Sequence, residues 1–86
     1  MNFEVFFDKQ PEKFLEKIDN KDCKRILDKI EELFSKEPVP SSSKRIMGEH
    51  GVYRIRIGDY RAIYRINYDT NKIIIIKIDK RDKVYE

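Results

Sequence analysis

Residues 52–66 read VYRIRIGDYRAIYRI, and this stretch constrains the fold more than any other part of the chain. Apolar residues alternate with arginines on both sides of Gly58-Asp59, a dipeptide suited to a two-residue hairpin turn. Because side chains along a strand point alternately to the two faces of a sheet, a shift of one residue would exchange the faces. The pattern predicts a β-hairpin with strands at 52–57 and 60–66.

This turn divides the hairpin into an apolar face and a cationic face. Three cross-strand pairs share the apolar face: Ile57 with Tyr60, Ile55 with Ala62, and Tyr53 with Tyr64. The cationic face holds the four arginines of the stretch: Arg54, Arg56, Arg61 and Arg65. Arg56 directly opposes Arg61, at a cost of about 0.2–1 kcal/mol. An anion bound between these arginines would replace their repulsion with a net attraction, so the face is a candidate anion site. The alternative is that the guanidiniums spread over apolar surface.

Two helices are predicted in the first half of the chain. After a strand at 2–7, Asp8 is a suitable N-cap and Pro11 fits the first turn of a short helix. A longer helix is indicated by an apolar stripe at helical spacing: Cys23, Ile26, Leu27, Ile30, Leu33 and Phe34. Glu37-Pro38 is expected to end it, because the residue before proline disfavours the α region.

The last strand is predicted at 72–78, KIIIIKI, whose apolar character indicates a central strand at least partly covered on both faces. A chain of 86 residues forms one domain, 1–86. The order of elements predicts an α+β fold with an N-terminal strand, a helical hairpin and a three-stranded antiparallel meander. We expect one antiparallel sheet packed by the two helices.

The residue content argues against several kinds of site. Cys23 is the single cysteine and cannot form an internal disulfide, and no Cys/His cluster has metal-ligand spacing. Neither a glycine-rich phosphate loop nor a Ser/His/Asp set is present, so we expect no cofactor and no metal. Without a signal peptide or a long apolar segment, the chain is expected to be cytoplasmic and not bound to a membrane.

Positive charge is concentrated in the second half of the chain. Residues 1–43 carry 8 Lys/Arg and 10 Asp/Glu, whereas residues 44–86 carry 11 and 6, giving net charges of −2 and +5. Six of the seven arginines lie in the second half. The planar guanidinium group matches phosphate geometry, so the distribution indicates phosphate recognition; the alternative is a solvated basic surface.

The C-terminal segment adds Lys80, Arg81 and Lys83, followed by Tyr85. A tyrosine beside guanidiniums can stack on a base or take part in proton transfer, and packing against the sheet edge is the alternative. Metal-independent cleavage of RNA suits these residue types, because the 2′-hydroxyl supplies the nucleophile. The protein then needs only to align the backbone, neutralise the phosphate and assist proton transfer.

Two segments carry a resemblance to a known family: KRIMGEHGVYRIRIGDYRAIYRI (44–66) and IDKRDKVYE (78–86). They are similar to the RelE branch of the RelE/ParE toxin superfamily, and the resemblance covers essentially the whole chain. It implies the toxin of a type II toxin-antitoxin system, a ribosome-dependent endoribonuclease (mRNA interferase) that cuts mRNA in the decoding site. It also implies neutralisation by a cognate RelB-like antitoxin in a hetero-oligomer.

The resemblance places the catalytic positions of the family on five residues: Arg54, Arg56, Arg61, Arg81 and Tyr85. Arg61 and Arg81 would stabilise phosphate charge, and Tyr85 would orient the 2′-hydroxyl or stack on a base. Arg54 or Arg56 would orient the backbone or assist proton movement, although relatives often have lysines there and arginine is a poor general base. We also expect RNA contacts from five further basic residues: Lys44, Arg45, Arg65, Lys80 and Lys83.

Two other functions compete with this interpretation. A ParE-like toxin would poison DNA gyrase without cutting RNA, although that branch generally lacks the full set of arginines and tyrosine. A non-catalytic antitoxin-binding module of the same fold would have kept the surface and lost the activity.

Overall fold

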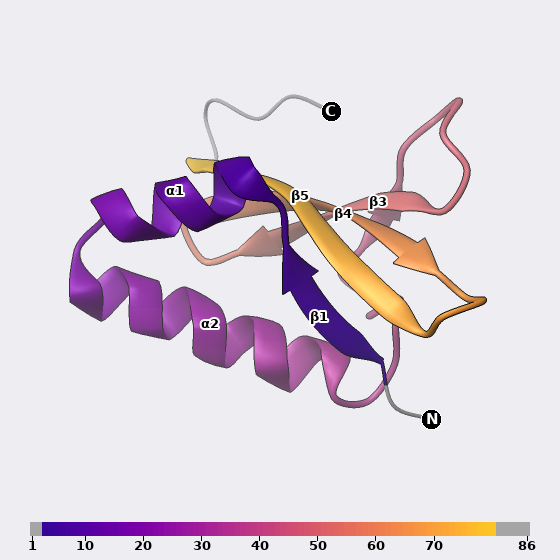
Figure 1. Ribbon diagram of the computed structural model, residues 1–86, viewed down its shortest axis with the longest axis horizontal. Coiled ribbons are helices and arrows are strands. Elements are labelled where there is room, and N and C mark those ends of the chain that lie inside the picture. The colour runs from indigo at the N-terminus through magenta and orange to yellow at the C-terminus, as the bar shows by residue number, and fades with distance from the viewer. Residues whose placement is uncertain (1–2, 81–86) are drawn as a thin grey trace.

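Two helices pack on a five-stranded sheet in the computed structural model, which describes residues 3–80 (Figure 1). The strands are β1 (Glu4–Phe7), β2 (Lys44–Arg45), β3 (Val52–Ile57), β4 (Tyr60–Asn67) and β5 (Lys72–Lys80). The helices are α1 (Lys9–Lys17) and α2 (Asn20–Phe34). The predicted α+β fold class, with its N-terminal strand, helical hairpin and antiparallel meander, is confirmed.

The strands lie in the order β1-β5-β4-β3-β2, and all neighbours except one pair are antiparallel. β1 pairs with β5 in parallel, from Glu4 opposite Lys72 to Phe7 opposite Ile75, so the sheet is mixed and the expectation of a wholly antiparallel sheet is wrong. Parallel neighbours need a long crossover between them, and here both helices and the meander lie between β1 and β5. The alternation of residues within β1 and β5 does not indicate whether the two strands run parallel or antiparallel.

The hairpin register agrees with the prediction at every pair, from Val52 opposite Arg65 to Ile57 opposite Tyr60. Gly58 has φ 58°, and Asp59 is not among the described residues with positive φ. A type II′ turn requires this combination, and its twist matches the twist of the paired strands. The turn therefore holds the two faces of the hairpin in the predicted arrangement.

The helices begin as expected, but α2 ends early. Asp8 caps α1 by accepting a hydrogen bond from the Lys9 amide at 2.9 Å. α2 ends at Phe34 with Ser35 at its C-cap, a few residues before Glu37-Pro38. At this end the Ser35 amide donates to the Glu31 carbonyl at 3.0 Å, and the Ser35 hydroxyl donates to the Glu32 carbonyl at 2.9 Å. The helix therefore stops just before the residue that the proline disfavours in the α region.

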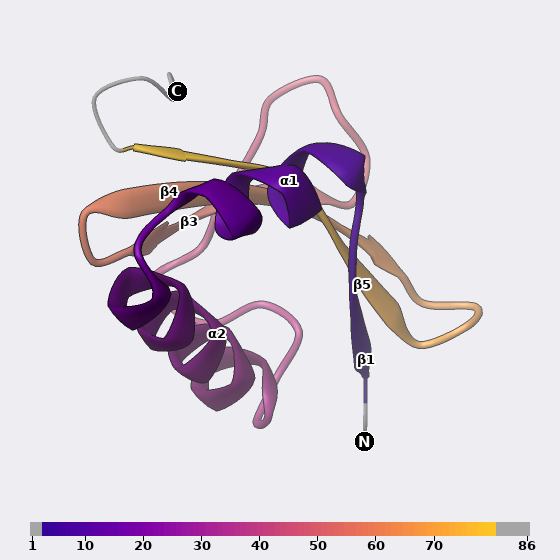
Figure 2. The same ribbon diagram turned by 60° about the vertical axis from the view of Figure 1, so that its left-hand side comes forward.

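The core lies between α2 and the apolar face of the sheet, and Figure 2 shows α2 across the sheet with α1 beside β5. Its buried residues from the helix are Ile26, Ile30 and Phe34. Its buried residues from the strands are Ile55, Ile57, Ala62, Tyr64, Ile66, Ile73, Ile75 and Ile78. Leu27, expected in the helical stripe, is 39% exposed because it faces the β1 side of the sheet, where α2 leaves an open cavity.

The isoleucine run of β5 is covered unequally on its two faces. Ile73, Ile75 and Ile78 are fully buried beneath the helices, whereas Ile74 and Ile76 are only half-buried. The expectation that this central strand is at least partly covered on both faces is confirmed. The side of the sheet opposite to α2 therefore remains accessible.

Candidate functional site

The accessible side of the sheet, here called the arginine face, carries basic residues in rows across the strands. Nearest the turn, Arg56 lies opposite Arg61, and Asp79 of β5 lies next in the same row. The second row runs across four strands through Lys44, Arg54, Ile63 and Lys77. Residues paired across strands share a face, so this register gathers the cations on one surface.

A cavity of about 300 Å³ opens between the first two rows, and we call it the arginine cavity. Its lining residues are Ser42, Lys44, Arg54, Ile55, Arg56 and Arg61. Arg54 and Arg61 are half-buried, whereas Lys44 and Arg56 are exposed. Four cationic side chains and no carboxylate line it. The cavity therefore suits a phosphate group, which several guanidiniums can bind through charge-assisted hydrogen bonds.

Strand β2 brings Lys44 to this cavity by pairing it with Arg54. The loop before β2 is anchored in the core by Tyr64, whose hydroxyl donates to the Pro38 carbonyl at 3.1 Å and lies 2.7 Å from the Ser43 hydroxyl. Burial raises the pKa of Tyr64 to about 12, so the hydroxyl keeps its proton to a higher pH than an exposed tyrosine would. A buried tyrosine on the apolar face thus holds the strand that carries Lys44.

The other predicted RNA-binding residues lie apart from the arginine cavity. Arg65 is exposed on the arginine face, in the row beyond Arg54. Arg45 pairs with Tyr53 and Lys80 pairs with Tyr60, which places both on the helix-covered side of the sheet at its rim. Three predicted site residues lie outside the described residues: Arg81, Lys83 and Tyr85.

Two features of the arginine face were missed by sequence reasoning. β2 has only two residues, both polar, so no periodicity indicates it. Asp79 reaches the row of Arg61 through an irregularity in the pairing of β4 with β5, between Ile63 and Tyr64. An extra residue in one strand shifts the faces that follow it, so alternation counted along the sequence does not predict the position.

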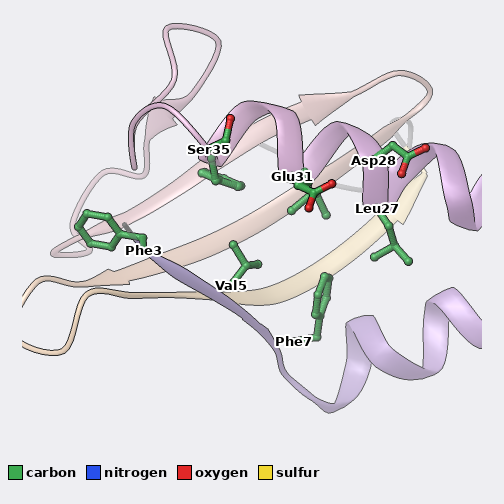
Figure 3. Close-up of a pocket in the computed structure, with 9 residues that line it drawn as sticks. Phe3, Val5, Phe7, Leu27, Asp28, Glu31 and Ser35 are labelled. Carbon is green, nitrogen blue, oxygen red and sulfur yellow. The ribbon is translucent and has the colours of Figure 1, made fainter. Parts of the chain in front are cut away.

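A second cavity, of about 420 Å³, lies on the helix side between β1 and α2 (Figure 3). Phe3, Val5 and Phe7 of the N-terminal segment form one wall, and Leu27 lies opposite on the helix. Its polar lining comes from Asp28, Glu31 and Ser35, and no lysine or arginine lines it. This cavity suits apolar side chains rather than phosphate.

The arginine cavity can bind and stabilise negative charge. Guanidinium groups remain protonated in proteins, so the three arginines can orient a phosphodiester and stabilise its transition state. Within residues 3–80, no three His, Cys, Asp or Glu side chains are grouped to hold a metal ion. In the same range, no helix is long and apolar enough to span a membrane.

Comparison with known proteins gives the class to which this fold and surface belong. A sequence profile described as the ParE toxin of the type II toxin-antitoxin system parDE matches residues 5–85. RelE1 of Methanocaldococcus jannaschii is 35% identical over an alignment of 89 residues, covering 100% of this chain and 98% of that protein. The chain belongs to the RelE/ParE family of type II toxins.

Two solved archaeal structures agree with this assignment. The RelE-RelB complex from Pyrococcus horikoshii contains a chain with a TM-score of 0.76 and 30% identity, covering 98% of this chain and 100% of that one. The RelB-RelE complex from Methanococcus jannaschii contains one with a TM-score of 0.69 and 32% identity, covering 95% and 96%. Both share the RelE-like fold described above.

Proposed function

We propose that this protein is the toxin of a type II toxin-antitoxin pair and inhibits translation by cutting mRNA in the decoding site of the ribosome. The observation that carries the proposal is the arginine cavity, in which Arg54, Arg56 and Arg61 converge with Lys44. A substrate with a 2′-hydroxyl needs no metal, because its own oxygen attacks the phosphorus. The expected products are a 2′,3′-cyclic phosphate and a 5′-hydroxyl.

The five catalytic residues divide into three roles in this proposal. Arg61 and Arg81 stabilise the charge that develops on the phosphate, where one well-placed donor contributes about 2.7–4 kcal/mol. Arg54 and Arg56 orient the backbone on either side of the scissile bond. Tyr85 orients the 2′-hydroxyl or stacks on a base.

The remaining basic residues act at a distance from the reacting phosphate. Arg65 extends the arginine face toward neighbouring phosphates, and Arg45 and Lys80 contact RNA around the rim. Lys83, outside the described residues, is proposed as a further RNA contact. Such contacts add affinity that falls as the salt concentration rises. The net charge of +5 on residues 44–86 is modest, so we infer that the ribosome positions the mRNA. A toxin that acts on translating ribosomes acts in the cytoplasm.

A RelB-like antitoxin is the proposed protein partner. The proposal is supported by the archaeal RelE chains from P. horikoshii and M. jannaschii, which were each solved with RelB. The apolar cavity beside β1 also leaves Leu27 exposed on the helix side. A segment that folds on binding can cover such surface and the arginine face together in one hetero-oligomer.

The test is to add purified protein to a translation extract and to map the mRNA ends. Cuts in phase with the codons are expected for the wild type, and Arg61→Ala and Arg81→Ala should each lose them. Lys36→Ala is the matched control, because Lys36 is exposed in the segment after α2 and away from the arginine face. Intact mRNA with the wild type, or equal cutting by all variants, would contradict the proposal.

Gyrase poisoning is the second candidate function, and the match of the ParE toxin profile to residues 5–85 favours it. A supercoiling assay with purified gyrase separates the two functions. Inhibited supercoiling with intact mRNA would replace the nuclease proposal. Absence of both activities, together with tight antitoxin binding, would identify a non-catalytic module.

A further inference from the structure

We propose that Lys44 is the general base of the arginine cavity, the group that removes the proton from the attacking 2′-hydroxyl. This inference rests on the proposed ribonuclease function and adds a catalytic residue to it. The arginines supply positive charge but cannot accept a proton at any pH at which the protein is folded. Cleavage therefore needs a different side chain to take the proton.

Lys44 is the one described residue lining the cavity whose side chain is an amine, the kind of group that can accept a proton in general base catalysis. The other lining side chains are three arginines, a serine and an isoleucine. A lysine amine loses its proton far more readily than a guanidinium, and lysine serves as a general base in enzymes. Among the described residues, the cavity thus separates the two tasks, charge stabilisation by arginine and proton transfer by lysine.

The position of Lys44 follows from pairing in the sheet. Lys44 lies directly opposite Arg54, and Arg56 and Arg61 line the same cavity from β3 and β4. The side chain is exposed and can reach a bound substrate, while its backbone is held by β2. Tyr64 anchors the preceding loop through Pro38 and Ser43. An exposed side chain on a backbone held by β2 suits a base that must approach the substrate.

The surroundings of Lys44 in the cavity carry no carboxylate. The charged groups that line the cavity beside it are the three arginines. The nearest acidic position in the rows is Asp79, which lies beyond Arg61 on β5 and does not line the cavity. Arg45, the next residue along β2, pairs with Tyr53 on the opposite face.

The proposed step balances as follows. The neutral amine of Lys44 takes the proton of the 2′-hydroxyl, and the 2′-oxygen forms a bond to phosphorus while the bond from phosphorus to the 5′-oxygen breaks. The departing 5′-oxygen takes a proton from a water molecule, and the protonated lysine returns its proton to the hydroxide that remains. The arginines stabilise the charge on the non-bridging oxygens throughout.

The test compares single-turnover cleavage of ribosome-bound mRNA by wild type, Lys44→Arg and Lys44→Ala from about pH 6 to about pH 9.5. Lys44→Arg keeps the charge and removes the base, so both variants should lose about 10²–10⁴ in rate, the usual contribution of general acid–base catalysis. The rise in rate with pH should disappear in both. Small primary amines added to Lys44→Ala should restore part of the rate, increasingly as the pH approaches the pKa of the amine.

Two controls make the outcome decisive. Lys36→Arg should cleave like the wild type, and melting curves should show that the Lys44 variants remain folded. A wild-type rate and pH profile for Lys44→Arg would overturn the inference and leave the ribonuclease function standing. Loss of the pH dependence in Tyr85→Phe but not in Lys44→Arg would assign the base to Tyr85 instead. A wild type that cuts no RNA would overturn the proposed function and this inference together.

Discussion

The two faces of the sheet are built from the same strands but meet opposite physical demands. Beneath the helices, Ile75 and Tyr64 are fully buried, and the Tyr64 hydroxyl has hydrogen-bond partners in Pro38 and Ser43. On the arginine face, the register places Arg56 opposite Arg61. The first arrangement stabilises the fold, whereas directly opposed like charges work against it, as expected of a surface that binds an anion under the function proposed above. Neighbouring residues along one strand can therefore serve stability and function separately.

The largest effect is expected where the helix-covered face is broken. Ile75→Ala leaves a cavity in the core and should lower the free energy of unfolding by about 2–5 kcal/mol. Its matched control is Ile74→Ala on the arginine face, where the side chain is only half-buried and the loss should be clearly smaller. Urea denaturation of both variants measures the difference. Equal losses would show that the two faces are packed alike.

The arginine face should respond in the opposite way. Arg56→Gln removes one of two opposed cations and should raise the free energy of unfolding by about 0.2–1 kcal/mol at low salt. Because salt screens surface charges, that gain should shrink as the salt concentration rises. Cleavage of ribosome-bound mRNA should fall by about 10²–10³-fold.

If Arg56→Gln lost both stability and activity, the conclusion that one face serves stability and the other serves function would be contradicted. Denaturation at two salt concentrations gives the first quantity, and end-mapping of mRNA gives the second. Gln is the replacement because it keeps much of the length of the side chain and removes its charge.

The Tyr64 hydroxyl anchors the loop that leads to Lys44, so its removal should affect both stability and cleavage. Tyr64→Phe removes the bonds to Pro38 and Ser43 and should lower the free energy of unfolding by about 1–2 kcal/mol, as measured by urea denaturation. Cleavage should fall by less than in Lys44→Arg, because the variant loosens β2 without removing the amine.

Tyr64 also predicts a dependence of stability on pH. Burial raises its pKa from 10.0 to about 12, so the folded state favours the neutral hydroxyl. That contribution is complete below about pH 10 and is lost as the pH rises from about 10 to about 12. The wild type should therefore lose stability over this range more steeply than Tyr64→Phe, as measured by urea denaturation at several pH values. Parallel curves would show that the hydroxyl is not isolated from solvent.

A modest effect on stability alone is expected at the turn that sets the register of both faces. Gly58→Ala introduces a side chain at φ 58° and should lower the free energy of unfolding by about 1 kcal/mol. A methyl group added at Gly58 would meet no atom within 4 Å apart from those of its two chain neighbours, so the cost should come from the backbone conformation. Asp59→Ala is the control without positive φ, and urea denaturation should show a smaller change in its stability.

Sequence reasoning predicted the elements with strong local signals. The hairpin pairs, the Asp8 cap and the order of helices and strands follow from residues close together in the chain. α2 ends at Phe34 with Ser35 at its C-cap, a few residues before the predicted stop at Glu37-Pro38. A proline marks the neighbourhood of a helix end in the sequence but not the last helical residue.

The candidate site was predicted in part. Arg54, Arg56 and Arg61 converge because one register serves all three, and that register is readable from the turn. The sequence predicts Lys44 only as one of several RNA contacts, and nothing in its neighbourhood indicates that it shares a cavity with the arginines. Its place depends on pairing between β2 and β3 across a loop without periodic pattern.

The sequence by itself determined which residues share each face of the hairpin, because side chains alternate with period two and Gly58-Asp59 allows one register. Tertiary structure alone decided which distant segments border those faces. It placed β1 parallel to β5, turned Asp79 toward the row of Arg61, and brought Lys44 beside Arg54. Such contacts depend on strand order and on a bulge, which arise from the packing of the whole chain and leave no local trace in the residues themselves.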